Sequence, residues 1–280
     1  MARNPRVGTC RRLSPARKFM TDLVHFGQKV PSVRIARTMR LREVARARAQ
    51  AEPRPSWAAI FLKAYAMVGV GRPFLRQAFM RWPWEHLYEH PFSVCTVMVE
   101  RMYQGEQVVL AMKIRSPETA PLTQITRTID RYQNGDVESL GTFRRALFNG
   151  ILPLPLRRLR WWLMLNRSGY KRCKRVGTYA LTGVGALGAE VDPIGPATSI
   201  LAPGPVDAAG NVRVQVRFDH RVTDAANMAR CLNEMEQFLQ AEILEELLSL
   251  RGEPEAEMGV GPVVGAKPVV RGMPLVVGAG

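Results

Sequence analysis

The chain has 280 residues, of which 46% are hydrophobic, and its formal net charge is +16 at pH 7. That hydrophobic fraction is ordinary for a globular protein and excludes wholesale disorder. The charge favours an anionic partner, such as nucleic acid, an acidic membrane surface or a phosphorylated cofactor, without choosing among them.

The cysteines and the chain start point to a reducing compartment. Cys10, Cys95, Cys173 and Cys231 form no CxxC pair and have no histidine at metal-ligand spacing, so we expect neither a disulfide scaffold nor a metal site. The basic N-terminus lacks the apolar run of a signal peptide, and no window offers about 20 uninterrupted apolar residues. We therefore expect a soluble, cytoplasmic protein.

The first elements follow a basic arm, which we expect to be flexible over residues 1–12. Ser14 and Pro15 are typical of a helix start and predict a helix over 14–28. Alternating residues predict a strand over 32–41, and a short helix should follow over 43–49. A helix that starts near Ser56 is apolar nearly all round and should be buried.

The middle of the chain predicts a hairpin and then an unusual insert. Alternating runs at 92–102 and 108–114 are typical of two paired strands. An amphipathic helix over 121–135 ends at Asn134-Gly135. The insert at 146–175 is rich in basic and aromatic residues and should be partly helical.

The last third predicts three strands and a long helix. A strand at 177–182 enters a glycine-rich turn, and further strands follow at 197–206 and 212–218. The final helix should run over 225–250. The tail at 251–280 is rich in Gly, Pro and Val and of low complexity.

The order of these elements predicts the fold class. Strands and helices alternate without a regular βαβ rhythm, which indicates an α+β domain with a mixed sheet flanked by helices. We assign one domain to residues 13–250.

His220 stands where a strand gives way to a helix, in the stretch "VRVQVRFDHRVTDAANMARCL". The strand points its valines to one face, and the helix presents an apolar stripe, so both elements should be anchored. An imidazole fixed between them could act as a general base near neutral pH. A structural histidine is the alternative, and Asp224 is a natural helix N-cap with or without chemistry.

Several ordered motifs resemble one family. "FDHRVTDAANMARCL" is similar to the DHRxxDG signature of the dihydrolipoyl acyltransferases, the core subunits of 2-oxoacid dehydrogenase complexes, which share the chloramphenicol acetyltransferase-like fold. "RRLSPARKFMTDLVHFGQ" resembles the opening helix of that family, and "GTYALTGVGALG" resembles its TFTISNLG segment. The resemblance covers roughly residues 12–135 and 176–248.

The resemblance implies roles for individual residues. His220 would be the general base, and Thr182, where the family has serine, would stabilise the oxyanion through its hydroxyl. Asp224 would hold the loop by an ion pair with Arg17, and Asp219 would support the site. The family places its site between subunits of a trimer, with the histidine and the hydroxyl from different chains. The substrates implied are acyl-CoA and a thiol or hydroxyl acceptor, with no metal and no covalently bound cofactor.

Two departures from the family pattern leave the function open. Ala225 replaces the family's glycine, and Thr182 replaces its serine. We also find no lipoyl domain, subunit-binding domain or swinging linker, so a lipoyl carrier would be a separate partner.

The insert at 146–175 has three interpretations. It could be a lid or trimer contact with buried tryptophans, an amphipathic surface for anionic lipid, or a source of phosphate contacts for coenzyme A from Arg172 and Lys174.

The function expected is therefore a stand-alone coenzyme-A-dependent acyltransferase, as a homotrimer. Its rivals are a catalytically silent trimeric scaffold and an anionic-surface binder. Nucleic acid is the least expected partner, because no nucleic-acid module is recognisable.

Overall fold

The computed structural model describes residues 8–251, so residues 1–7 of the predicted arm and 252–280 of the predicted tail lie outside the described residues. Within that range no helix combines the length and apolarity needed to cross a bilayer.

A six-stranded mixed sheet forms the centre of the domain, in the order β1-β8-β7-β6-β4-β5. The pairs β7–β6 and β6–β4 are parallel, whereas the pairs β1–β8, β8–β7 and β4–β5 are antiparallel. The strands are β1 Ser32–Arg40, β4 Val94–Tyr103, β5 Glu106–Arg115, β6 Tyr179–Leu181, β7 Ser199–Val206 and β8 Asn211–Asp219. A separate hairpin joins β2 Gln77–Met80 to β3 His86–Glu89.

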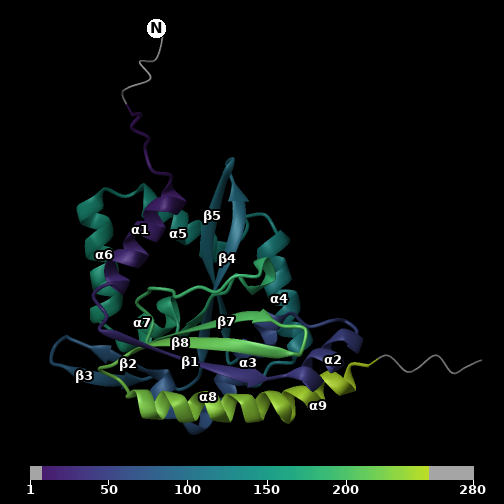
Figure 1. The fold of residues 1–280 in the computed structure, drawn as a ribbon. Helices are drawn as coiled ribbons and strands as arrows, with labels where there is room; N and C mark the ends of the chain where they lie inside the picture. The colour runs from purple at the N-terminus through teal and green to yellow at the C-terminus, as the bar shows by residue number, and fades with distance from the viewer. Residues whose placement is uncertain (1–7, 252–280) are drawn as a thin grey trace, which may run out of the picture.

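One face of the sheet packs against α3 Trp57–Gly71, which the sequence predicted as buried. The Tyr179 hydroxyl donates to the Leu62 carbonyl at 2.6 Å, and the Tyr65 and Tyr179 rings lie 4.9 Å apart. Beside α3 lies α8 Ala225–Gln240, which also packs against β1 and is drawn along the lower edge of Figure 1. The remaining elements on this side are α2 Arg42–Gln50, α4 Leu122–Asn134, α9 Glu242–Ser249 and the short 3-10 helix η1 Pro73–Arg76.

The other side of the domain carries α1 Pro15–Gly27, α5 Gly141–Ile151, α6 Leu154–Asn166 and α7 Gly169–Val176, with α1, α5 and α6 grouped together in Figure 1. The predicted start of α1 is confirmed, since the Ser14 hydroxyl accepts from the Arg17 backbone N–H at 3.1 Å. The insert is helical as predicted, because α5, α6 and α7 account for most of it.

The final helix differs from its prediction. The sequence predicts one helix over 225–250, but the chain breaks at Ala241, between α8 and α9. The break brings Glu246 against the start of α4, where its carboxylate accepts from the Leu122 backbone N–H at 2.7 Å and pairs with Lys63. A contact across the fold, which no local pattern encodes, thus accompanies the turn between the helices.

Candidate functional site

His220 lies directly after β8, with one ring nitrogen hydrogen-bonded and the other without a partner among residues 8–251. Its backbone N–H donates to the Pro31 carbonyl at 3.0 Å, which fixes the loop to β1. Its Nδ1 lies 3.0 Å from the Thr223 carbonyl oxygen. A carbonyl cannot donate, so a neutral imidazole must carry its proton on Nδ1. Nε2 is then the acceptor, on a side chain that is 49% exposed.

The two aspartates beside His220 differ in burial. Asp219 is fully buried, and its carboxylate accepts from the Arg221 side chain at 2.9 and 2.7 Å. The Arg221 guanidinium in turn stacks over the Phe79 ring at 4.2 Å, so the loop is braced from two sides. Asp224 is 76% exposed and lies 3.5 Å from the His220 Nδ1, and it makes no side-chain cap bond to α8.

The predicted Arg17–Asp224 ion pair is wrong for this chain. Arg17 instead pairs with Glu106 at 3.2 Å and donates to the Gln107 carbonyl at 3.3 Å. The reason is the position of α1, which packs against α5 and β5 and therefore carries Arg17 to the tip of the β4–β5 hairpin.

Thr182 lies just past the end of β6, where its backbone N–H donates to the Leu201 carbonyl at 3.1 Å. No side-chain hydrogen bond to Thr182 occurs among the described residues. Its neighbours Gly183 and Gly185 lie close to the β7 backbone, so this turn is tightly packed against the next strand.

One chain does not bring His220 and Thr182 together. Leu181 pairs with Leu201, which pairs with Val216, so Thr182 lies level with Gln215. His220 is five residues further along β8 and two strands away. At about 3.3 Å per residue and about 4.8 Å per strand, their Cα atoms are roughly 19 Å apart.

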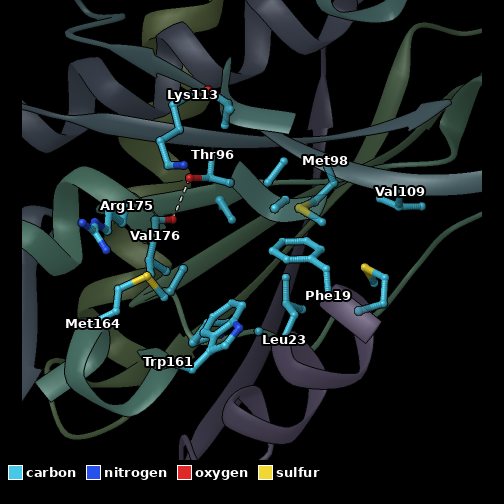
Figure 2. A pocket seen from close by; sticks show the side chains of 18 of the residues that line it. Phe19, Leu23, Thr96, Met98, Val109, Lys113, Trp161, Met164, Arg175 and Val176 are labelled. Atoms are coloured by element: carbon cyan, nitrogen blue, oxygen red, sulfur yellow. Dashed lines mark hydrogen bonds between the residues drawn. The ribbon is translucent and has the colours of Figure 1, made fainter. Parts of the chain in front are cut away.

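Thr182 instead faces a large cavity of about 1200 Å³ between the sheet and the helices α1, α5, α6 and α7. The sheet contributes alternate residues, which include Thr96 and Met98 of β4 and Ala111 and Lys113 of β5. Figure 2 shows Phe19 and Leu23 of α1 facing this sheet, with Trp161 of α6 beside them. His220 is not among the lining residues.

The two residues predicted to bind coenzyme A, Arg172 and Lys174, lie in different environments. Lys174 lines the cavity and is exposed, with its ammonium 5.8 Å from the Tyr170 ring centroid. Arg172 is buried, and its guanidinium donates to the carbonyls of Phe79, Leu165 and Pro196. A guanidinium that is engaged by three carbonyls joins α7 to its surroundings, so the prediction of a phosphate contact from Arg172 is corrected to a structural role.

A buried ion pair that the sequence did not suggest joins the insert to α1. Asp22 of α1 is fully buried and lies 2.6 Å from the Arg157 Nε and 3.2 Å from the Arg158 Nε of α6. Burial raises the pKa of Asp22, and the two arginines oppose that rise. Trp161 is buried between Phe19 and Phe26, as the interpretation of a lid or trimer contact requires, whereas Trp162 is 45% exposed.

The arrangement of the sheet and helices is similar to that of solved 2-oxoacid dehydrogenase acyltransferase cores. The similar solved structures include dihydrolipoamide acetyltransferase of Azotobacter vinelandii, with a TM-score of 0.60 and 16% identity over 89% of this chain and 100% of that one. A probable dihydrolipoamide acetyltransferase of Listeria monocytogenes has a TM-score of 0.57 and 16% identity over 83% of this chain and 94% of that one. A truncated catalytic core of the 2-oxoacid dehydrogenase complex of Thermoplasma acidophilum has a TM-score of 0.57 and 14% identity over 84% of this chain and 99% of that one.

Neither a protein-family model nor a curated protein matches this sequence. The predicted α+β class, with a mixed sheet flanked by helices, is confirmed, and the fold is similar to that of the dihydrolipoamide acetyltransferase core. At 14–16% identity the similarity establishes the fold alone.

Most residues of the cavity wall were not predicted from the sequence as site residues. Lys113 is the only charged residue in the run "VVLAMKI", and that interruption was the available signal. Phe19 and Leu23 gave none, because an apolar residue on an amphipathic helix is expected to join the core.

Proposed function

We propose that the chain is a coenzyme-A-dependent acyltransferase whose active site forms between two copies. The observation that supports this proposal is that His220 and Thr182, the two residues proposed to react, lie far apart within one chain. His220 presents a free Nε2 at one end of the sheet, and Thr182 opens into a cavity roughly 19 Å away. A second copy that supplies His220 to this cavity would complete the site, as the family resemblance implies for a trimer.

The proposed reaction needs no metal. His220 Nε2 takes the proton from a thiol or hydroxyl acceptor, whose sulfur or oxygen then attacks the thioester carbonyl carbon. The Thr182 hydroxyl donates a hydrogen bond to the oxyanion. Collapse of the intermediate breaks the carbon–sulfur bond, and the coenzyme A thiolate takes the proton back from the imidazolium. In this proposal Lys174, which lines the cavity, contacts a phosphate of coenzyme A.

A fold relative supports these roles. In the Azotobacter vinelandii acetyltransferase, a serine, a histidine and an asparagine have been investigated for their roles in the catalytic mechanism, and the asparagine is four residues after the histidine. His220 and Asp224 have the same spacing, and a threonine hydroxyl can replace a serine hydroxyl as a hydrogen-bond donor.

The test is thioester consumption by the full chain with free dihydrolipoamide and a panel of other thiols and alcohols. His220→Ala should lower the rate by about 100- to 10,000-fold if His220 is the base. His86→Ala is the matched control, since His86 lies on β3 away from the cavity lining, and it should leave the rate unchanged. Equal turnover by wild type and His220→Ala would remove the assignment. Absence of turnover in wild type with every acceptor would favour the scaffold alternative.

A second candidate function rests on the outer face of α6. Apart from Arg160, its exposed side chains are apolar, and the helix turns Arg157 inward. Residues 141–176 carry ten Lys or Arg and no Asp or Glu. We define the α6 outer face by its large exposed residues: Leu154, Leu156, Leu159, Trp162 and Leu163.

Such a face suits an anionic bilayer, which accepts apolar side chains and attracts the surrounding cations. In co-flotation with vesicles, wild type should bind phosphatidylserine-containing membranes and not neutral ones. The double variant Leu159→Glu, Trp162→Glu should lose that binding, whereas Leu87→Glu, a control on β3, should keep it. If the double variant instead changes only the oligomeric state, the α6 outer face is a subunit contact.

A further inference from the structure

The cavity has a long apolar body. In Figure 2, Phe19, Leu23, Met98, Trp161 and Met164 lie around the cavity, which they line. Binding pockets of about 300–1,000 Å³ already enclose a drug-sized molecule, and this cavity has about 1200 Å³. The apolar lining therefore has room for an apolar chain longer than an acetyl group.

A group of cations lies at one end of that body. Lys113 projects from β5 beside Thr96, as Figure 2 shows, and Arg145 of α5 and Arg175 of α7 line the same end while remaining exposed. Burial, together with the charges of Arg145 and Arg175, lowers the pKa of Lys113 to about 8. The positive charge of Lys113 is therefore poorly compensated in the chain as it stands.

These cations have no acidic partner of their own. None of the three forms an ion pair with a carboxylate in the part of the chain that the structure describes. The single acidic residue of the lining, Asp192, is already paired with Arg217 and Arg34. An anion arriving from outside would therefore meet three unpaired cations at the edge of an apolar cavity.

We propose that the cavity binds an amphipathic anion, that is, an apolar chain bearing one carboxylate or phosphate. The chain lies among Phe19, Met98 and Trp161, and the anionic group lies at Lys113, Arg145 and Arg175. The register of β4 and β5 places Lys113 opposite Thr96. The register of β4 and β6 places Thr182 level with Met98, two residues further along β4. The Cα atoms of Lys113 and Thr182 are then about 12 Å apart, so a single bound molecule can reach both.

This inference rests on the proposed function only in naming the bound chain as the acyl group that is transferred. The recognition itself needs no catalysis. A binding experiment can therefore fail while turnover succeeds, and the reverse outcome is equally distinguishable.

The experiment is calorimetric titration of the full chain with probes that vary one feature at a time. Octanoate and octyl phosphate carry the chain and an anion, 1-octanol carries the chain alone, and acetate carries an anion alone. At least one of the two anionic amphiphiles should bind 10-fold or more tightly than 1-octanol, because its anionic group accepts charge-assisted hydrogen bonds that a neutral hydroxyl cannot match. Acetate should show no binding.

Two variants locate the parts of the site. Lys113→Met should weaken binding of the anionic amphiphile about 10-fold and leave 1-octanol unchanged, whereas Met164→Gln should weaken both. Lys18→Met, a lysine of α1 that does not line the cavity, is the matched control and should have no effect. Equal affinity for the anionic amphiphiles and 1-octanol, or wild-type affinity in Lys113→Met, would overturn the proposal.

Discussion

The ion pair between α1 and α6 gives the sharpest test of how the insert is held. Asp22 is fully buried, and Arg157 is only 7% exposed at 2.6 Å from it. Replacing Asp22 with Asn removes the negative charge but leaves Arg157 buried and uncompensated. Breaking a buried pair from one side costs about 3–5 kcal/mol. At 2–4 °C per kcal/mol for a chain of this size, the unfolding midpoint should fall by roughly 10 °C.

The pair itself should be worth much less than that loss. Burial raises the pKa of Asp22 even with two arginines beside it, so the attraction does not fully offset the cost of burying the charge. The double variant Asp22→Asn, Arg157→Met should therefore recover most of the lost stability. Chemical denaturation of the two single variants and the double variant measures this coupling as a mutant cycle.

The control is the exposed pair Glu43–Arg46, which has a similar distance of 2.9 Å but side chains that are 64% and 63% exposed. Glu43→Gln should change the free energy of unfolding by less than about 0.5 kcal/mol. If Asp22→Asn were as mild as Glu43→Gln, the buried pair would not hold α6, and the reasoning about the insert would be refuted.

Two further predictions concern charges near the cavity. The pKa of Lys113 is lowered to about 8 from an ordinary value of 10.5, so between these pH values the unfolded chain holds a proton that the folded chain has released, and wild-type stability rises with pH. Lys113→Met should be more stable than wild type at pH 7 by up to about 3 kcal/mol. In urea unfolding, this difference in the free energy of unfolding should shrink by about 1 kcal/mol at pH 9. A difference that stays constant with pH would contradict the lowered pKa. Arg172→Met should destabilise by about 2–4 kcal/mol in the same assay, because buried carbonyls lose their donor, whereas Lys174→Met should leave stability unchanged and weaken acyl-CoA binding. A destabilised Lys174→Met alongside a stable Arg172→Met would reverse these roles.

Local patterns in the sequence predicted most of the strands and helices. The alternation at 32–41 and 212–218 was sufficient for β1 and β8, and Ser14-Pro15 located the start of α1. The β2–β3 hairpin was missed, because its strands are four residues each. Short strands give a periodic signal too weak to separate from a helix.

The candidate site was predicted residue by residue but not in its arrangement. The strand-to-helix junction indicated His220, and the resemblance indicated Thr182, yet their separation within one chain depends on strand order, which periodicity does not encode. Arg17 was assigned the wrong partner because an ion pair joins elements distant in sequence. The inward arginine and outward leucines of α6 were not predictable, since Asp22, which draws Arg157 inward, lies more than a hundred residues earlier.

The central claim is that His220 of one copy serves the cavity and Thr182 of another, and mixed oligomers test it directly. His220→Ala and Thr182→Val should each be nearly inactive alone. Random mixing of equal amounts pairs an intact His220 with an intact Thr182 at about one site in four, so thioester turnover should return to about a quarter of the wild-type rate. If the mixture stays as inactive as its two components while assembling normally, the histidine and the hydroxyl do not work across a subunit boundary, and the account is contradicted.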